Sequence, residues 1–189
     1  MKLNSLHIFL SGIVIICFSC AAERKSAKYY QDNKADLVTL KTYYDSLYRK
    51  QPFSAGFTDK SCRYYVMQIN TDTLRSVYTT DTKKEELWKN VLRYQYDTVL
   101  LNKMAGKMKH LKCLWLGKTT DWLGEQKETY TFISFGSALV DKPFVEDKYY
   151  ILIFLDHKII HPEVETNIKK GKLVPVDDLV YFTIGSSYR

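Results

Sequence analysis

Two histidines and a glutamate near the end of the chain are the first residues whose types and spacing suggest chemistry. His157 and His161 stand four positions apart, and Glu163 follows closely. Histidines at this spacing share one face of a helix and could ligate zinc there, while a carboxylate beside them could serve acid and base steps. Pro162 disfavours helix at the preceding residue, so we expect a polar loop after a strand. We therefore predict no metal site here, and His157, His161 and Glu163 remain weak candidates for one.

The cysteines offer a second kind of chemistry. Cys62 and Cys113 are the two thiols that remain once Cys17 and Cys20 near the N-terminus are set aside. In an oxidising compartment they are a possible disulfide, closing a loop of about 50 residues. The alternative is two buried cysteines that pack as small hydrophobic residues. A nucleophile pair of Cys113 with His110 is disfavoured, because residues three apart on a strand face opposite sides.

No serine nucleophile is expected either, because the sequence lacks the Gly-x-Ser-x-Gly pattern of a strand-to-helix nucleophile elbow. Gly136 has no glycine-rich phosphate loop around it and is expected to form a turn between strands. We therefore predict no catalytic residue, no resident metal and no cofactor.

The first twenty residues have the organisation of an export signal. Lys2 provides a basic start, and the run from Leu6 to Phe18 is almost entirely apolar. A basic start, a short apolar run and a small residue before the cleavage point are the features of a secretory signal. The run is shorter than the ~20 apolar residues that a membrane-spanning helix needs, so we expect it to be removed.

The end of this segment, Ile16-Cys17-Phe18-Ser19-Cys20, resembles the lipobox of bacterial lipoproteins. Its Phe-Ser-Cys form is similar to signals of the Bacteroides group, whereas most lipoboxes carry leucine in place of Cys17 and a small residue in place of Phe18. The resemblance implies cleavage before Cys20, acylation of its thiol and attachment of the protein to a membrane by that lipid. The alternative is an ordinary secretory signal in which Cys20 is incidental. The resemblance covers only these first residues and identifies no family for the rest.

Composition predicts one globular domain after the signal. The hydrophobic fraction is 46% and the charged fraction 26%, without low-complexity segments. The remaining ~170 residues are enough to bury a sizeable single core. We expect a lipoprotein signal peptide at residues 1–19, a lipidated cysteine with a short tether at 20–28, and a single α+β domain at 29–189.

The net charge of +7 restricts the partners. Basic surfaces meet nucleic acid, anionic lipid or acidic glycans, and an exported protein seldom meets nucleic acid. We expect a membrane partner through the N-terminal lipid and an envelope protein, anionic lipid or glycan as a further partner. A lysine-rich soluble surface explains the charge equally well. The fifteen tyrosines could likewise form a binding face or fill half-buried strand positions.

Periodicity outlines the elements of the domain. Leu37, Leu40, Tyr44 and Leu47 form one apolar stripe, which predicts a helix from about residue 29 to 50. Residues 63–69 and 74–80 flank a turn and predict a hairpin. Thr82 and Glu85 have the spacing of a capping box, which predicts a second helix running to about residue 108. Further strands are predicted at 111–116, 129–135, 149–155 and 179–184.

The order of these elements predicts the fold class. Strands and helices do not alternate, which argues against a doubly wound parallel sheet. We expect an α+β fold in which an antiparallel sheet of about five to six strands carries two helices on one face.

The first functional hypothesis is a lipid-anchored, non-enzymatic module that binds or organises another component of the bacterial cell envelope, in the periplasm or at the surface. One alternative is a small envelope hydrolase using His157, His161 and Glu163. Another is an immunity-type lipoprotein that neutralises a toxin.

Overall fold

The structure is a computed structural model that describes residues 4–58, 61–71, 73–82, 89–123, 126–139 and 147–185. Side chains are described from residue 22 onward within these ranges, except at 90, 121–123, 126, 138 and 139. The helices are α1 (Asn4–Tyr48), α2 (Thr98–His110) and α3 (Pro162–Lys169), with a short 3-10 helix η1 (Lys89–Tyr94). The strands are β1 (Phe53–Phe57), β2 (Tyr64–Asn70), β3 (Arg75–Asp81), β4 (Trp115–Leu123), β5 (Gln126–Leu139), β6 (Lys148–Leu155), β7 (Val174–Asp177) and β8 (Val180–Gly185).

The strands of the described residues form one eight-stranded antiparallel sheet in the order β3-β2-β1-β4-β5-β6-β8-β7. The α+β class and the antiparallel sheet are confirmed, as is the hairpin of β2 and β3. The expected five to six strands are too few, because β1 and β7 lack a run of β-branched or aromatic residues and were not predicted. A third helix, α3, adds to the two that the sequence predicts.

Helix α1 is longer than the sequence predicts. It is continuous from Asn4 to Tyr48 and so includes the residues predicted as signal peptide and tether. The apolar stripe is confirmed and extends back toward the N-terminus at helical spacing. Its buried residues are Ala22, Ser26, Tyr30, Leu37, Leu40, Tyr44 and Leu47. The side chain of Cys20 lies outside the described side chains.

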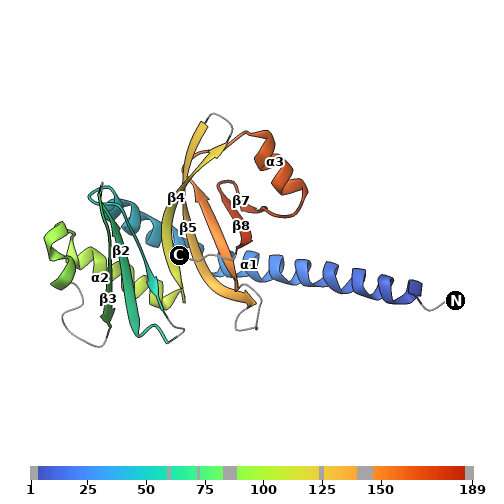
Figure 1. The fold of residues 1–189 in the computed structure, drawn as a ribbon, viewed down its shortest axis with the longest axis horizontal. Helices are drawn as coiled ribbons and strands as arrows, with labels where there is room; N and C mark the ends of the chain where they lie inside the picture. Colours follow the sequence, from blue (N-terminus) through green and yellow to red (C-terminus); the bar gives the residue numbers. More distant parts are fainter. Residues whose placement is uncertain are drawn as a thin grey trace.

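The N-terminal part of α1 leaves the domain, while the rest runs across the sheet (Figure 1). Across the part of the chain that the structure describes, no helix has a stretch both long and apolar enough to cross a bilayer.

The second helix begins later than the predicted capping box. Thr82 lies in the turn after β3, and Glu85 lies outside the described residues. Helix α2 begins at Thr98, where the Asp97 carboxylate accepts a hydrogen bond from the backbone N–H of residue 100 at 3.0 Å and caps the helix. Gln95 has φ of 56°, a left-handed conformation that no helix continues through, and so separates η1 from α2.

The main core lies between helices α1 and α2 and one face of the sheet, and tyrosines fill much of it. The Tyr44 hydroxyl donates to the Phe53 carbonyl at 2.6 Å, and the Tyr30 hydroxyl donates to the Asp177 carboxylate at 2.6 Å. A buried phenol needs such a partner, because an unpaired hydroxyl inside the core is costly. These tyrosines hold α1 to the sheet and do not form a binding face.

Helix α3 was not predicted, although His161 is extended as the following Pro162 led us to expect. Residues 156–161 form the expected loop after β6, but Pro162 then begins a helix. Proline is favoured at the first helical position, because the N–H it lacks would have no partner within the helix there. His161 lies just before it and serves as the N-cap, accepting the backbone N–H of Glu163 at 3.2 Å.

Candidate functional site

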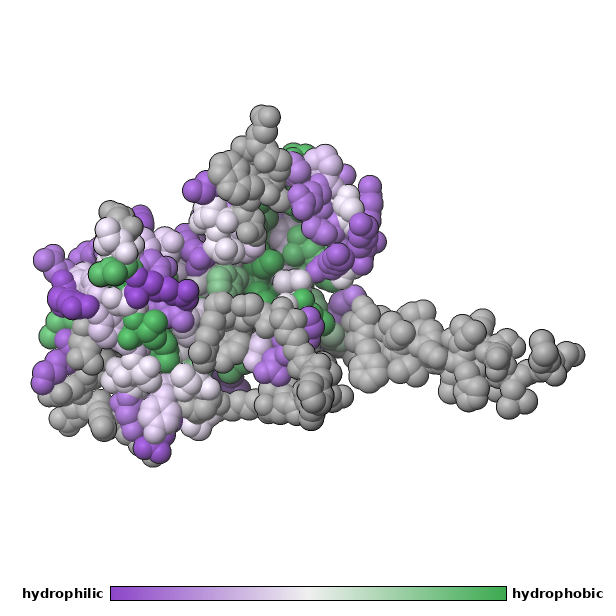
Figure 2. Space-filling view, viewed as in Figure 1, coloured by the Kyte–Doolittle hydropathy of each residue, from purple (hydrophilic) through white to green (hydrophobic). Residues whose placement is uncertain are grey.

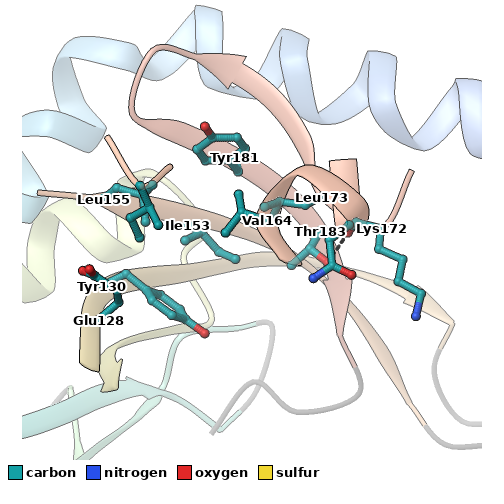
Figure 3. Close-up of a pocket in the computed structure, with 11 residues that line it drawn as sticks. Glu128, Tyr130, Ile153, Leu155, Val164, Lys172, Leu173, Tyr181 and Thr183 are labelled. Atoms are coloured by element: carbon teal, nitrogen blue, oxygen red, sulfur yellow. Dashed lines mark hydrogen bonds between the residues drawn. The ribbon is translucent and has the colours of Figure 1, made fainter. Parts of the chain in front are cut away.

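A cavity of about 260 Å³ lies between α3 and the sheet (Figure 3). It is lined by Glu128 and Tyr130 of β5, Ile153 and Leu155 of β6, Tyr181 and Thr183 of β8, Val164 and Asn167 of α3, and Ile159, Lys172 and Leu173 of the adjoining loops. Most of these side chains are apolar. The site is therefore a small, mostly apolar pocket with polar groups at its rim.

Strand alternation places the cavity on the face opposite α1. The ring of Phe154 in β6 packs near Tyr30 of α1, with 6.4 Å between the ring centroids. Neighbouring residues on a strand point to opposite faces, so Ile153 points away from α1. Tyr181 lies directly opposite Ile153 in the pairing of β6 with β8 and shares its face. A second apolar sheet surface thus remains, and α3 covers it.

Helix α3 covers one side of the cavity without being firmly packed. None of its residues is buried. The turn after it is better fixed, because the backbone N–H of Lys172 donates to the Asn167 carbonyl at 2.9 Å and the Thr183 hydroxyl donates to the Lys172 carbonyl at 2.8 Å. Elements with few buried contacts open at low free-energy cost, so α3 is expected to be less stable than the sheet it covers.

The two ends of the cavity differ in charge. The Glu128 carboxylate is 3.3 Å from Nε2 of His157, and only 13% of the Glu128 side chain is exposed. At the opposite end lies Lys172 (Figure 3). Within the described part of the chain, the Lys172 ammonium and the Asn167 side-chain amide make no hydrogen bond or ion pair. The Lys172 ammonium can therefore pair with an acidic group of a ligand without losing an existing partner.

The three candidates from the sequence have separate roles. His157 pairs with the cavity residue Glu128, whereas His161 uses its ring nitrogen to cap α3. Glu163 lies exposed in the first turn of α3, where a carboxylate complements the helix dipole. Among the described residues, no three histidine, cysteine, aspartate or glutamate side chains are grouped as a metal site would require.

Cys62 and Cys113 are both buried. The Cys113 thiol donates to the Trp115 carbonyl at 3.4 Å. Burial raises the pKa of the Cys113 thiol, and the nearby Cys62 raises that pKa further. A thiol with a raised pKa is a poor nucleophile. His110 instead lies 3.3 Å from the Asp36 carboxylate, so the structure does not pair it with Cys113. The disulfide between Cys62 and Cys113 stays a prediction.

Gly136 lies inside β5 rather than in a turn. The pairing of β5 with β6 shifts register between Ser134 and Gly136, which marks a bulge. Bulges bend a strand and increase its twist, so this position contributes to the curvature of the sheet.

The cavity itself was not predicted from the sequence. Its residues come from five separate stretches of chain, so no local spacing identifies them. The one available signal was the continuous apolar run Tyr150-Ile151-Leu152-Ile153-Phe154 in β6, which is typical of a strand buried on both faces. Such a run indicates that something covers the second face, though not what.

Comparison of the chain with protein-family models, with curated proteins and with solved structures finds no match.

Proposed function

We propose that the chain is an exported bacterial lipoprotein, held to a membrane by a lipid on Cys20, whose domain binds an envelope component through the cavity beneath α3. The Ser19-Cys20 signal supports the anchor. The apolar cavity supports the binding role and is the observation on which that role depends. The proposed location is the bacterial cell envelope, in the periplasm or at the surface.

The size and lining of the cavity favour one kind of ligand group. Sites for whole drug-sized ligands are typically about 300–1,000 Å³. The cavity of about 260 Å³ is smaller, which suits a compact apolar group carried by a larger molecule. Lys172 at one end favours an acidic substituent on that group. A short acyl or aromatic group next to a carboxylate or phosphate has this chemistry.

The hydrolase alternative has less support. General acid–base catalysis needs two groups that reach the same reacting atoms. His161 is engaged as a helix cap, and His157 is paired with Glu128. The arrangement of these side chains favours a binding module over a hydrolase.

Filling the cavity tests the binding role. Anilinonaphthalene sulfonate has apolar rings and an anionic group, and we expect it to bind the protein with saturable fluorescence enhancement. Val164→Trp places an indole in the cavity and should weaken probe binding by about tenfold or more. Tenfold in affinity corresponds to the free energy of burying about one apolar side chain. Fluorescence titration measures the affinity of each protein.

Val99→Trp is the matched control. Val99 lies in α2 with 63% of its surface exposed, so the same substitution there should leave probe affinity unchanged. Urea unfolding of both variants checks that the fold is retained. Equal affinity of Val164→Trp and Val99→Trp, or no saturable binding to the natural protein, would count against the cavity as a binding site.

A further inference from the structure

Very little chain separates the proposed lipid from the packed domain. Ala22 lies two residues after Cys20, and its side chain is already buried. Ser26 follows one turn later, fully buried, with its hydroxyl donating to the Ala22 carbonyl at 2.9 Å. Two helical residues rise about 3 Å. A lipid on Cys20 would therefore hold this end of the domain against the bilayer instead of on a flexible tether.

The structure identifies what lies at this end of the domain. A second cavity, of about 340 Å³, has Ala22 and Glu23 of α1 on one side and Gly171 and Lys172 after α3 on the other. Ile184 of β8 also lines it and is 44% exposed. The turn between α3 and β7 thus sits beside the first packed turn of α1.

Both segments that meet at this cavity carry a net positive charge, although Glu23 of α1 also lines the cavity. Arg24 and Lys25 follow Ala22 in α1, and both are exposed. Lys169, Lys170 and Lys172 surround Gly171 and are exposed as well. These five cations are called the basic end below. In Figure 2, hydrophilic side chains cover the side of the α3 region from which the N-terminal part of α1 leaves the domain.

Helix stability alone does not explain the basic end. Lys169 lies in the last turn of α3, where a cation complements the helix dipole. Lys170 and Lys172 lie beyond the last helical residue. Arg24 and Lys25 belong to another helix, where the Lys25 ammonium lies 4.9 Å from the centroid of the Tyr150 ring. Glu163 and Glu165 lie in the first turn of α3 and Lys169 in the last, so the acidic and basic residues of this helix are at opposite ends.

We propose that the basic end binds an anionic lipid surface and fixes the orientation of the anchored domain, with α3 and the β7 turn against the headgroups. This inference depends on the proposed lipid anchor. Cations within about 8 Å of a charged surface are only partly screened at physiological salt. A link of two residues brings the first packed turn of α1 close to the headgroups, and the turn after α3 lines the same cavity as that turn. The membrane would then also lie close to the cavity beneath α3, since Lys172 borders both cavities.

Lysine labelling on vesicles tests this orientation. The full protein, extracted from its own membranes, is reconstituted into neutral phosphatidylcholine vesicles and into vesicles that also contain phosphatidylglycerol. An amine-reactive reagent followed by mass spectrometry gives the labelling rate of each lysine. We expect Lys25, Lys169 and Lys170 to react about fivefold more slowly on the anionic vesicles, and this protection to disappear at high salt. Lys50 lies just beyond the far end of α1 and should react equally on both kinds of vesicle.

Charge reversal provides the matched variants. Lys169→Glu with Lys170→Glu should abolish the protection of Lys25 on anionic vesicles. Arg49→Glu with Lys50→Glu makes the same charge change just beyond the far end of α1 and should leave that protection intact.

Two results would overturn the inference while leaving the anchor in place. One is a protein that floats with both kinds of vesicle but shows the same labelling rates on each. The other is stronger protection by a soluble anionic polysaccharide than by anionic vesicles, which would assign the basic end to a glycan. Failure to float with either kind of vesicle would contradict the anchor itself, and the inference with it.

Discussion

Replacing Gly56 with alanine is expected to destabilise the protein by about 3 kcal/mol. The added Cβ would lie 2.2 Å from the Leu114 carbonyl oxygen and 2.2 Å from Cε3 of Trp115. The carbonyl is held in place, because it accepts the backbone N–H of Phe57 at 2.9 Å. The indole is almost fully buried, and packed interiors have little room for displacement. The Trp115 ring therefore requires a glycine beneath it in β1.

Two other glycines serve as controls for this substitution. Gly106 lies inside α2 with nothing within 4 Å of an added Cβ, so alanine there should stabilise the protein by about 0.5–1 kcal/mol. At Gly117 the nearest atom is the tip of the Phe132 ring at 2.8 Å, which can tilt, so the cost should be intermediate. Urea unfolding followed by circular dichroism ranks the three variants. A Gly56→Ala protein as stable as Gly106→Ala would contradict the packing of Trp115 over β1.

Replacing Lys118 with methionine should cost about 2 kcal/mol, between the values typical of exposed and of buried ion pairs. Lys118 of β4 lies 2.9 Å from Asp45 of α1 and 3.8 Å from Asp156 after β6. Lys41 completes a four-charge cluster, 2.7 Å from each of the same carboxylates. Only 13% of the Lys118 side chain is exposed. Without it, two carboxylates at the helix–sheet junction would share a single cation.

Lys28→Met is the matched control, because Lys28 pairs with Asp32 at 2.9 Å on the open surface of α1, with 77% of its side chain exposed. The loss there should be below about 0.5 kcal/mol. Denaturant unfolding at low and high salt measures both variants. If Lys118→Met and Lys28→Met lower the free energy of unfolding by the same amount, the cluster contributes no more to stability than a surface ion pair.

Acid should reduce the effect of Lys118→Met. Burial raises the pKa of Asp156, but the hydrogen bond from Lys41 and the charges of Lys41 and Lys118 outweigh it, so the folded pKa lies below its ordinary value. A carboxyl with a lowered folded pKa contributes stability above its unfolded pKa, near 4, and loses it as the pH falls through the folded value. The stability gap between Lys118→Met and the natural protein should therefore narrow below about pH 4.

The parts of the fold that the sequence predicted are those with regular apolar spacing. The stripe through Leu37, Leu40 and Tyr44 determines which face of α1 is buried, and the structure confirms it. The hairpin of β2 and β3 was predicted from the composition of residues 63–69 and 74–80 and from the turn between them, and the structure confirms it. Strand β1 could not be predicted in this way, because its Phe-Ser-Ala-Gly-Phe sequence is typical of a loop. Only the distant Trp115 explains why a glycine lies within this strand.

The residues at which helices begin and end depend on backbone conformations that apolar periodicity does not reveal. Residues 82–108 carry an unbroken apolar pattern, yet the left-handed Gln95 interrupts it and Asp97 begins a new helix. Pro162 acts as a helix start because His161 adopts an extended cap conformation before it.

The candidate site was still harder to predict. His157 was singled out for its residue type, and it contacts the cavity residue Glu128 without lining the cavity itself. The cavity itself is formed by alternate residues of three paired strands and by α3. These residues are far apart in the sequence, so no local pattern connects them.

The most direct test of the proposed function is mass spectrometry of the intact protein extracted from its own membranes. We expect a chain that begins at Cys20 and carries acyl chains, and an unacylated protein when Cys20 is replaced by alanine. A mass that includes residues 1–19, or an unmodified N-terminus on the extracted protein, would contradict the lipid anchor and the orientation of the domain inferred from it.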